Sequence, residues 1–187
     1  MLLSEPDFLT NKEITACFAG HRPSKLPFPE DETEKIRLIQ KLIRREIEDA
    51  LDLSYTTFIT GMAKGVDTWA AMEVLQLKNK YSAIKLVGVS PFRAEIEHLK
   101  GADLWRYDLI RHGCDQMVFL ADSYFPNCYL VRNKFMVDHS SLVIGAVSDM
   151  QSGTGNTIRY AKKMGLNMRI IDINSLSDSC NPDYIII

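Results

Sequence analysis

Short apolar runs alternate along the chain with segments whose apolar residues recur every three or four positions. Six runs have the length and side-chain content of strands: Thr15 to Ala19, Thr56 to Thr60, Ile84 to Ser90, Gln116 to Ala121, Leu142 to Val147 and Met168 to Ile173. Strands that alternate with helices form a parallel sheet with helices on both faces. The pattern therefore predicts an α/β fold with a doubly wound, mainly parallel sheet flanked by helices.

The segments between the strands predict helices with one buried face. The first has apolar residues at helical spacing, namely Ile36, Ile39, Ile43, Ile47 and Ala50. A second helix beginning near Val66 would bury Ala70, Val74 and Leu77. The last would run from about Thr154 to Met164, with Gly165 at the position that favours glycine after a helix. We also expect Trp69 and Trp105 to anchor the core.

A chain of 187 residues is long enough for one α/β domain and short for two. We predict a single domain over residues 1–187, with its core at residues 13–173 and a C-terminal tail at 174–187. The tail ends in Tyr184-Ile185-Ile186-Ile187. We expect this apolar end to dock on the domain, with an edge strand as one form.

Charge and cysteine usage narrow the classes of function. The formal net charge is −2, which disfavours general coating of nucleic acid and leaves room for a local basic cleft. The four cysteines form no C-x-x-C pair, and no basic leader or apolar run of about 20 residues is present. We therefore expect reduced thiols, a cytoplasmic protein and no membrane partner.

The loops that follow the strands should gather on one rim, where open α/β sheets bind ligands. After the second strand comes the turn Gly61-Met62-Ala63-Lys64-Gly65-Val66-Asp67, which leads directly into a helix. Glycine permits close backbone approach, and a helix start offers unpaired N–H groups to an anion. A tight turn with an ordinary cap explains the same residues. Asp67 in the first helical turn fits the helix dipole or a ribose-hydroxyl contact.

Two further segments on this rim have the chemistry of an anion site. Arg22 follows the first strand within Gly20-His21-Arg22-Pro23, and its guanidinium could bind a phosphate or form a surface ion pair. Ser152-Gly153-Thr154 opens the last helix with small residues and hydroxyls, as an anion site or an N-cap would. Together with the glycine turn, they favour a nucleotide-like ligand.

The helix between the fourth and fifth strands begins near Tyr129-Leu130-Val131-Arg132-Asn133-Lys134. Arg132 is a candidate for phosphate binding, and Asn133 for amide recognition or loop bracing. Tyr124 and Tyr129 could stack on a base or fill gaps between helix and sheet. The four histidines, His21, His98, His112 and His139, show no metal-ligand spacing, and no G-x-S-x-G motif occurs, so we predict neither a metal nor a covalent serine mechanism.

Taken in order, four segments resemble the YpsA-like branch of the SLOG superfamily: Phe18 to Pro23, Gly61 to Ala71, Arg132 to Met136 and Ser152 to Thr154. The resemblance covers roughly residues 13–173. It implies a bacterial protein with a Rossmann-like fold that binds or processes a nucleotide-derived ligand, such as NAD or ADP-ribose. It carries a binding rim onto Arg22, Gly61, Gly65, Arg132, Gly153 and Thr154. With Gly20, His21, Asp67 and Asn133, these form the predicted ligand-binding set.

Two better-known relatives of that superfamily imply competing functions. The DNA-processing protein A family binds single-stranded DNA and has segments similar to Gly65-Val66-Asp67 and Arg132-Asn133-Lys134. The lysine decarboxylase-like phosphoribohydrolases have a catalytic glutamate after their last glycine motif, where this chain reads Thr157-Ile158-Arg159. That departure weighs against hydrolysis unless Asp67 or Asp149 substitutes. We predict a homo-oligomeric sensor of a nucleotide or NAD-derived ligand, with a nucleotide hydrolase and a single-stranded DNA binder as alternatives.

Overall fold

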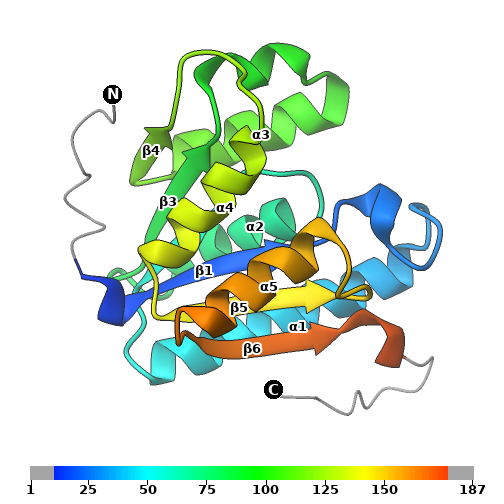
Figure 1. The fold of residues 1–187 in the computed structure, drawn as a ribbon. Coiled ribbons are helices and arrows are strands. Elements are labelled where there is room, and N and C mark those ends of the chain that lie inside the picture. The colour runs from blue at the N-terminus through cyan, green and yellow to red at the C-terminus, as the bar shows by residue number, and fades with distance from the viewer. Residues whose placement is uncertain (1–10, 177–187) are drawn as a thin grey trace.

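The computed structural model describes residues 11–176, which form a six-stranded, all-parallel sheet with helices on both faces (Figure 1). The sheet order is β4-β3-β2-β1-β5-β6. The strands are β1 (Thr15–Gly20), β2 (Thr57–Thr60), β3 (Lys85–Ser90), β4 (Gln116–Phe119), β5 (Leu142–Val147) and β6 (Asn167–Asp172). The α-helices are α1 (Thr33–Asp52), α2 (Val66–Lys78), α3 (Gly101–Gly113), α4 (Cys128–Asp138) and α5 (Gly153–Lys163). Short 3-10 helices lie at η2 (Lys12–Ile14), η3 (Pro23–Lys25), η4 (Arg93–His98) and η5 (Ile173–Ser175).

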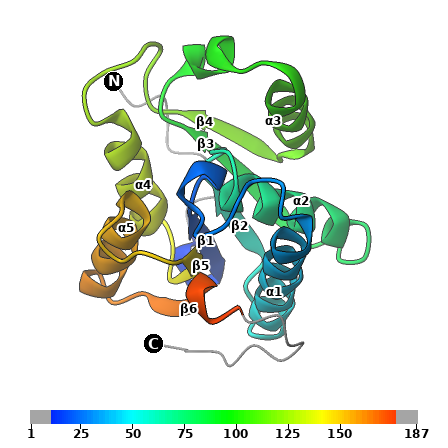
Figure 2. The same cartoon turned by 90° about the vertical axis from the view of Figure 1, so that its right-hand side faces the viewer.

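Two layers of helices enclose the sheet, with α1, α2 and α3 on one face and α4 and α5 on the other (Figure 2). Buried apolar side chains fill both spaces between helices and sheet. On the first face the rings of Phe18 and Phe58 stack, with centroids 6.0 Å apart. A central strand buried on both faces needs apolar side chains in both directions, and β1 is buried from Thr15 to Ala19.

The direction of winding reverses at β1. The strands β2, β3 and β4 follow on one side of β1, whereas β5 and β6 lie on the other. The connections that leave the carboxyl ends of β1 and β5 therefore pass to opposite faces of the sheet. Open α/β sheets bind ligands in the crevice that such a reversal creates.

The predicted doubly wound sheet is confirmed, and every strand of it is parallel. Most predicted strands agree with the observed ones within a residue at each end, while β4 ends at Phe119, two residues before the predicted Ala121. The last helix begins one residue before the predicted Thr154. Gly165 follows it with φ of 77°, the left-handed conformation expected of a glycine in that place.

One predicted core residue is wrong. Trp105 lies on α3 with 64% of its surface exposed, because that helix buries only Tyr107 and Ile110. Trp69 on α2 is partly buried and packs against the core, in line with the expectation. The predicted docking of the apolar tail falls on residues 177–187 and lies outside the described residues. No helix between residues 11 and 176 is long and apolar enough to cross a membrane.

Candidate functional site

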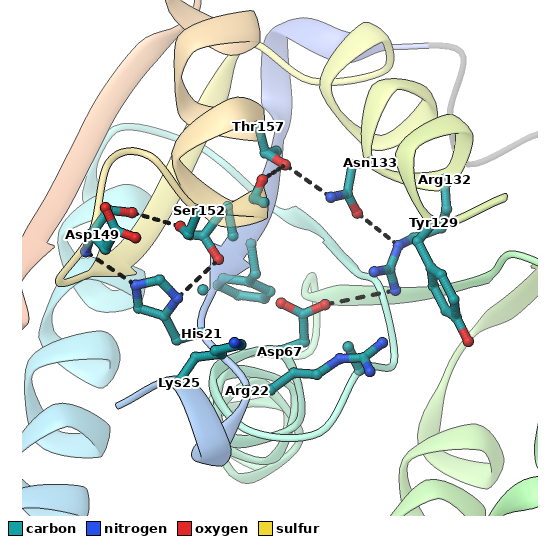
Figure 3. Close-up of a pocket in the computed structure, with 16 residues that line it drawn as sticks. His21, Arg22, Lys25, Asp67, Tyr129, Arg132, Asn133, Asp149, Ser152 and Thr157 are labelled. Carbon is teal, nitrogen blue, oxygen red and sulfur yellow. Dashed lines mark hydrogen bonds and ion pairs between the residues drawn. The ribbon is translucent and has the colours of Figure 1, made fainter. Parts of the chain in front are cut away.

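A cleft of about 410 Å³ lies at the carboxyl ends of β1 and β5, where the winding reverses (Figure 3). Its walls come from the loop after β1, the start of α2, the first turns of α4 and the connection from β5 to α5. The lining residues are Phe18, Ala19, Gly20, His21, Arg22, Lys25, Ala63, Asp67, Tyr129, Arg132, Asn133, Asp149, Ser152, Gly153, Thr154 and Thr157. The structure thus brings together all the predicted site residues except Gly61 and Gly65.

Gly61 and Gly65 do not line the cleft, and each allows another group to approach its backbone closely. A Cβ on Gly61 would overlap the guanidinium of Arg132, and a Cβ on Gly65 would overlap the backbone carbonyl of His21. Gly65 has φ of 93° and ψ of −129°, a conformation that only glycine adopts readily. Gly65 thus lets the start of α2 approach the loop after β1, whereas Gly61 leaves room for Arg132 of α4, and contact of either glycine with a ligand stays a prediction.

The end of β1 packs directly against the start of α2. Gly20 faces Val66 so closely that a Cβ would overlap the valine side chain. The N–H of Val66 donates to the carbonyl of His21 at 3.2 Å, so this first amide of α2 is already used within the protein. The β1 loop therefore covers the first amide of α2, and a phosphate contact at the start of this helix stays a prediction.

The start of α5, unlike that of α2, presents backbone N–H groups to the cleft. Ser152 caps the helix, because its hydroxyl oxygen accepts from the N–H of Gly155 at 3.1 Å. Among residues 11–176, no hydrogen-bond acceptor is found for the N–H groups of Gly153 and Thr154. Both residues line the cleft. Free amides and the positive end of the helix dipole make this the part of the cleft best suited to an anion.

His21 directly follows β1 and accepts hydrogen bonds from the connection between β5 and α5, on the other side of the point where the winding reverses. Its Nε2 accepts hydrogen bonds from the backbone N–H groups of Ser148 at 3.0 Å and Asp149 at 3.4 Å. Its Nδ1 lies 3.4 Å from Oγ1 of Thr154. The side chain is buried, and burial lowers the pKa of His21 although nearby Asp149 acts in the opposite direction. The neutral imidazole therefore holds the connection from β5 to α5 against the end of β1.

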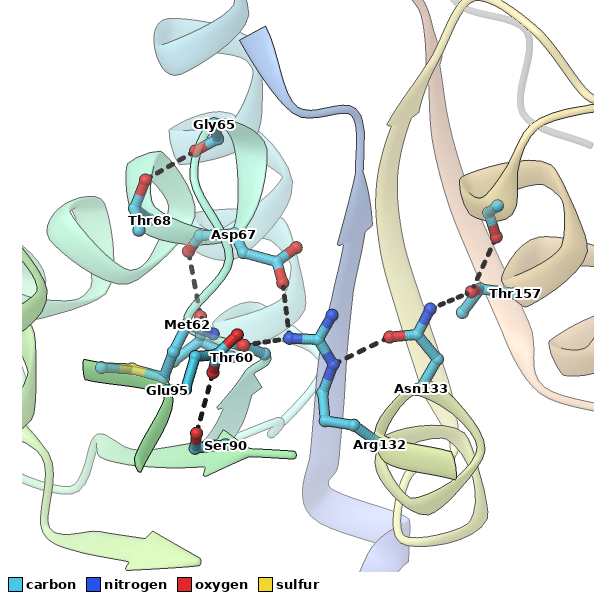
Figure 4. A network of polar contacts seen from close by, with 12 residues as sticks. Thr60, Met62, Gly65, Asp67, Thr68, Ser90, Glu95, Arg132, Asn133 and Thr157 are labelled. Atoms are coloured by element: carbon cyan, nitrogen blue, oxygen red, sulfur yellow. Dashed lines mark hydrogen bonds and ion pairs between the residues drawn. The ribbon is translucent and has the colours of Figure 1, made fainter. Parts of the chain in front are cut away.

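Arg132 and Asn133 brace the floor of the cleft (Figure 4). The guanidinium of Arg132 donates to the carbonyl of Gly61 and, through Nε, to Oδ1 of Asn133 at 2.9 Å. Asn133 in turn donates to the hydroxyl of Thr157 on α5 at 2.8 Å. Only 5% of Arg132 is exposed. Of the two roles predicted for Asn133, the structure shows bracing. Two of the N–H groups of Arg132 donate to the protein itself, and phosphate binding by this residue stays a prediction.

Asp67 is buried at the centre of the cleft. Its carboxylate lies 3.9 Å from the guanidinium of Arg132. Burial raises the pKa of Asp67 to about 6, although Arg132 and the backbone N–H groups of Ala63 and Gly61 favour the ionised form. The carboxyl group can therefore gain or lose a proton near neutral pH, which suits a hydrogen bond to a hydroxyl group or a proton transfer.

Arg22 and Lys25 supply the accessible positive charge. Both side chains are exposed and line the cleft, and neither forms an ion pair with a carboxylate among the described residues. The guanidinium of Arg22 lies over the ring of Tyr129, 5.2 Å from its centroid. Tyr129 thus already holds a cation on its ring, whereas Tyr124 is 64% exposed, packs edge-on against Phe92 and lies outside the cleft.

Lys25 is the lining residue that the sequence interpretation missed. It lies three residues after Arg22, at the end of the 3-10 turn η3. Residues three apart in such a turn share one side. The sequence contained that signal, since Pro23 after Arg22 favours a turn that would return the next cation to the same rim. No group of three or more histidine, cysteine or carboxylate side chains between residues 11 and 176 could hold a metal ion.

Comparison with known proteins places this site in a family. The model of the YpsA family, described as the YspA SLOG family, matches residues 16–176. The SPbeta prophage-derived protein YoqJ of Bacillus subtilis is 28% identical over 149 residues, which cover 72% of this chain and 82% of that protein. The UPF0398 protein of Staphylococcus saprophyticus is 20% identical over 174 residues, which cover 89% and 93% of the two chains.

Two solved structures share the fold. DNA processing protein A from Streptococcus pneumoniae superposes with a TM-score of 0.59 at 19% identity, covering 88% of this chain and 51% of that one. The Helicobacter pylori protein of the same name gives a TM-score of 0.59 at 17% identity, covering 96% and 72%. This chain therefore spans about half the length of the first structure, and the likeness shows the fold alone. Because the family model matches nearly the whole described chain, the chain belongs to the YpsA family of SLOG proteins.

Proposed function

We propose that the cleft binds a phosphate-bearing nucleotide or NAD-derived ligand, and that the protein acts as a sensor or regulator. One observation carries this proposal: two exposed cations, Arg22 and Lys25, line the same cleft as the open N–H groups of Gly153 and Thr154. Cations and helix-start amides are the groups that proteins use to hold phosphate. A volume of about 410 Å³ lies in the range of small-molecule sites.

The charges divide the cleft into two parts. Phosphate oxygens fit beside Gly153, Thr154, Arg22 and Lys25. Asp67 and Asp149 would repel a second anionic group nearby when they are ionised. A hydroxyl-bearing group such as ribose fits beside Asp67, because a carboxylate accepts hydrogen bonds from hydroxyls. The ligand class that satisfies both parts is a sugar phosphate or nucleotide.

Isothermal titration calorimetry with AMP, ADP, NAD and ADP-ribose tests the proposal. Arg22→Ala and Lys25→Ala should each weaken the ligand that binds by about 10- to 100-fold, since a hydrogen bond to a charged group contributes about 1.5–3 kcal/mol. Arg37→Ala and Lys41→Ala on the exposed face of α1 are matched controls and should leave the affinity unchanged. Unchanged affinity in both cleft variants would refute the proposed site.

A nucleotide hydrolase is the second candidate, and the carboxyl group of Asp67 favours it. A buried acid with a pKa of about 6 at the centre of a cleft is suited to activate water or protonate a leaving group. Chromatography of the ligand after incubation distinguishes the two functions. A sensor returns the ligand intact, while a hydrolase releases free base or ribose phosphate and loses that activity in Asp67→Asn.

Single-stranded DNA is the third candidate. It comes from the fold neighbour in Helicobacter pylori, DNA processing protein A, which is described as having a unique single-stranded DNA binding mode. Binding that rests on several phosphate contacts weakens steeply as salt concentration rises. Fluorescence anisotropy with a labelled oligonucleotide at 50 and 200 mM salt tests this function, and displacement of the oligonucleotide by ADP-ribose would show that both ligands share the cleft.

A further inference from the structure

The His21 ring makes three contacts, two to the connection from β5 to α5 and one to the first turn of α5. Nε2 receives the backbone N–H groups of Ser148 at 3.0 Å and Asp149 at 3.4 Å, and Nδ1 faces Oγ1 of Thr154 at 3.4 Å. In Figure 3 the ring lies between Asp149 and the start of α5. A side chain from the end of β1 thus positions the part of α5 that borders the cleft.

The two N–H groups determine which nitrogen carries the proton. A ring nitrogen that accepts hydrogen bonds must present its lone pair, so Nε2 is unprotonated. In a neutral imidazole the proton then lies on Nδ1, and the Nδ1–H group donates to the oxygen of Thr154. Because this donation fills an acceptor position of the threonine hydroxyl, its own proton remains available to another acceptor.

We propose that His21 is a positioning residue, whose Nδ1–H tautomer fixes the connection from β5 to α5 and directs the hydroxyl proton of Thr154 toward an anion in the cleft. This inference rests on the proposed function, since it assigns Thr154 as a donor to that ligand. The role of His21 differs from that of Arg22 and Lys25, because the histidine acts on the ligand through Thr154 and not by its own charge.

Protonation of His21 would reverse its contacts. An Nε2–H group would face the N–H groups of Ser148 and Asp149, so donors would oppose donors and the connection would move. Five other charged side chains line this cleft: Asp149 from the same connection, Asp67 from α2, Arg132 from α4, and Arg22 and Lys25 from the β1 loop. Burial lowers the pKa of His21 more strongly than Asp149 raises it, so the neutral form holds at pH 7.

Nitrogen-15 NMR of the histidine ring tests the tautomer in the free protein, independently of any ligand. At pH 7 we expect a protonated Nδ1 and an unprotonated Nε2, with two-bond couplings to the ring protons that identify each nitrogen. A protonated Nε2, or two exchanging tautomers, would overturn the assignment. A merely space-filling histidine would not be held in one tautomer.

The affinity for ADP-ribose between pH 5 and pH 8 tests the consequence for binding, because its pyrophosphate does not titrate in that range. Protonation of His21 should lower the wild-type affinity by about tenfold. Asp67, whose pKa is about 6, is present in the wild type and in the variants, so the difference between their pH profiles reports His21. His21→Gln, whose amide oxygen can accept the same two N–H groups, should bind nearly as well at pH 8 and lose less affinity in acid. His21→Ala should bind about tenfold more weakly throughout.

The variants also separate failure of this inference from failure of the proposed function. If wild-type protein binds ADP-ribose and His21→Gln shows the same pH profile, His21 is not the titrating positioning residue and the inference is overturned. If His21→Ala binds as tightly as wild type, it is likewise overturned. If the wild type does not bind ADP-ribose at any pH, binding of this ligand class fails, and the donor role of Thr154 fails with it, whatever the ring tautomer.

Discussion

Gly65→Ala tests how the start of α2 is joined to the end of β1. The glycine has φ of 93° and ψ of −129°, which an alanine adopts only with strain of about 1–3 kcal/mol. Its new methyl group would also overlap the carbonyl of His21 and lie 2.9 Å from Cδ of Pro23. Backbone and a proline ring cannot rotate away, so the β1 loop itself must move.

The backbone strain and the overlap of the new methyl group should destabilise the protein by similar amounts. Overpacking in a well-packed region costs about 1–3 kcal/mol, which together with the backbone strain gives an expected loss of about 4 kcal/mol in the free energy of unfolding. Gly153→Ala is the matched control. A Cβ at Gly153 would meet no atom within 4 Å, so this change should alter stability by about 0.5 kcal/mol or less.

Urea denaturation followed by circular dichroism measures both variants against the wild type. The midpoint of Gly65→Ala should fall sharply with an unchanged dependence on urea, while the midpoint of Gly153→Ala should stay near that of the wild type. A loss below about 1 kcal/mol in Gly65→Ala would show that the β1 loop yields easily and would refute the close fit inferred here.

Two further predictions concern buried charge and an exposed ring. Burial raises the pKa of Asp67 from 3.8 to about 6, so its contribution to folding is largest below pH 3.8 and declines as pH rises through 6. Arg132→Met should therefore lower the free energy of unfolding by about 3–5 kcal/mol at pH 7, because it leaves the ionised carboxylate of Asp67 unpaired. The loss should be smaller at pH 5, and an equal loss at both pH values in urea denaturation would contradict the coupling of Arg132 to Asp67. Trp105→Ser should change the free energy of unfolding by about 0.5 kcal/mol or less because the ring is exposed, and a loss above 2 kcal/mol would place Trp105 in the core after all.

The sequence was sufficient to predict the sheet and the place of the cleft. Apolar runs separated by helical periodicity predict strands directly, and the loops after parallel strands must share one edge. Arg22, Gly153 and Thr154 follow or precede elements with clear boundaries, so their position on the rim could be predicted. The neighbour order that places β5 beside β1 required the structure, since the pattern of runs is the same for several strand orders.

The roles of Arg132 and Trp105 could not be read from residue type. A guanidinium that binds phosphate and one that braces a loop look the same in sequence. Only the structure shows that Arg132 lies on the buried face of α4 and donates to the carbonyl of Gly61, and its contact with a ligand stays a prediction. A tryptophan on a helix is usually buried, yet α3 packs with one narrow face on its neighbours. In both cases the deciding information is which side of a helix meets the rest of the protein.

Titration of nitrogen-15-labelled protein with ADP-ribose, followed by amide NMR spectra, shows directly whether the start of α5 binds the ligand. We expect the amide signals of Gly153 and Thr154 to shift first and furthest, with smaller shifts at Arg22 and Lys25, because the open N–H groups of Gly153 and Thr154 bind the phosphate. A second groove is lined by Met72, Leu99 and Trp105. No shift at any concentration, or shifts confined to that second groove, would contradict the assignment of the cleft at β1 and β5 as the ligand site.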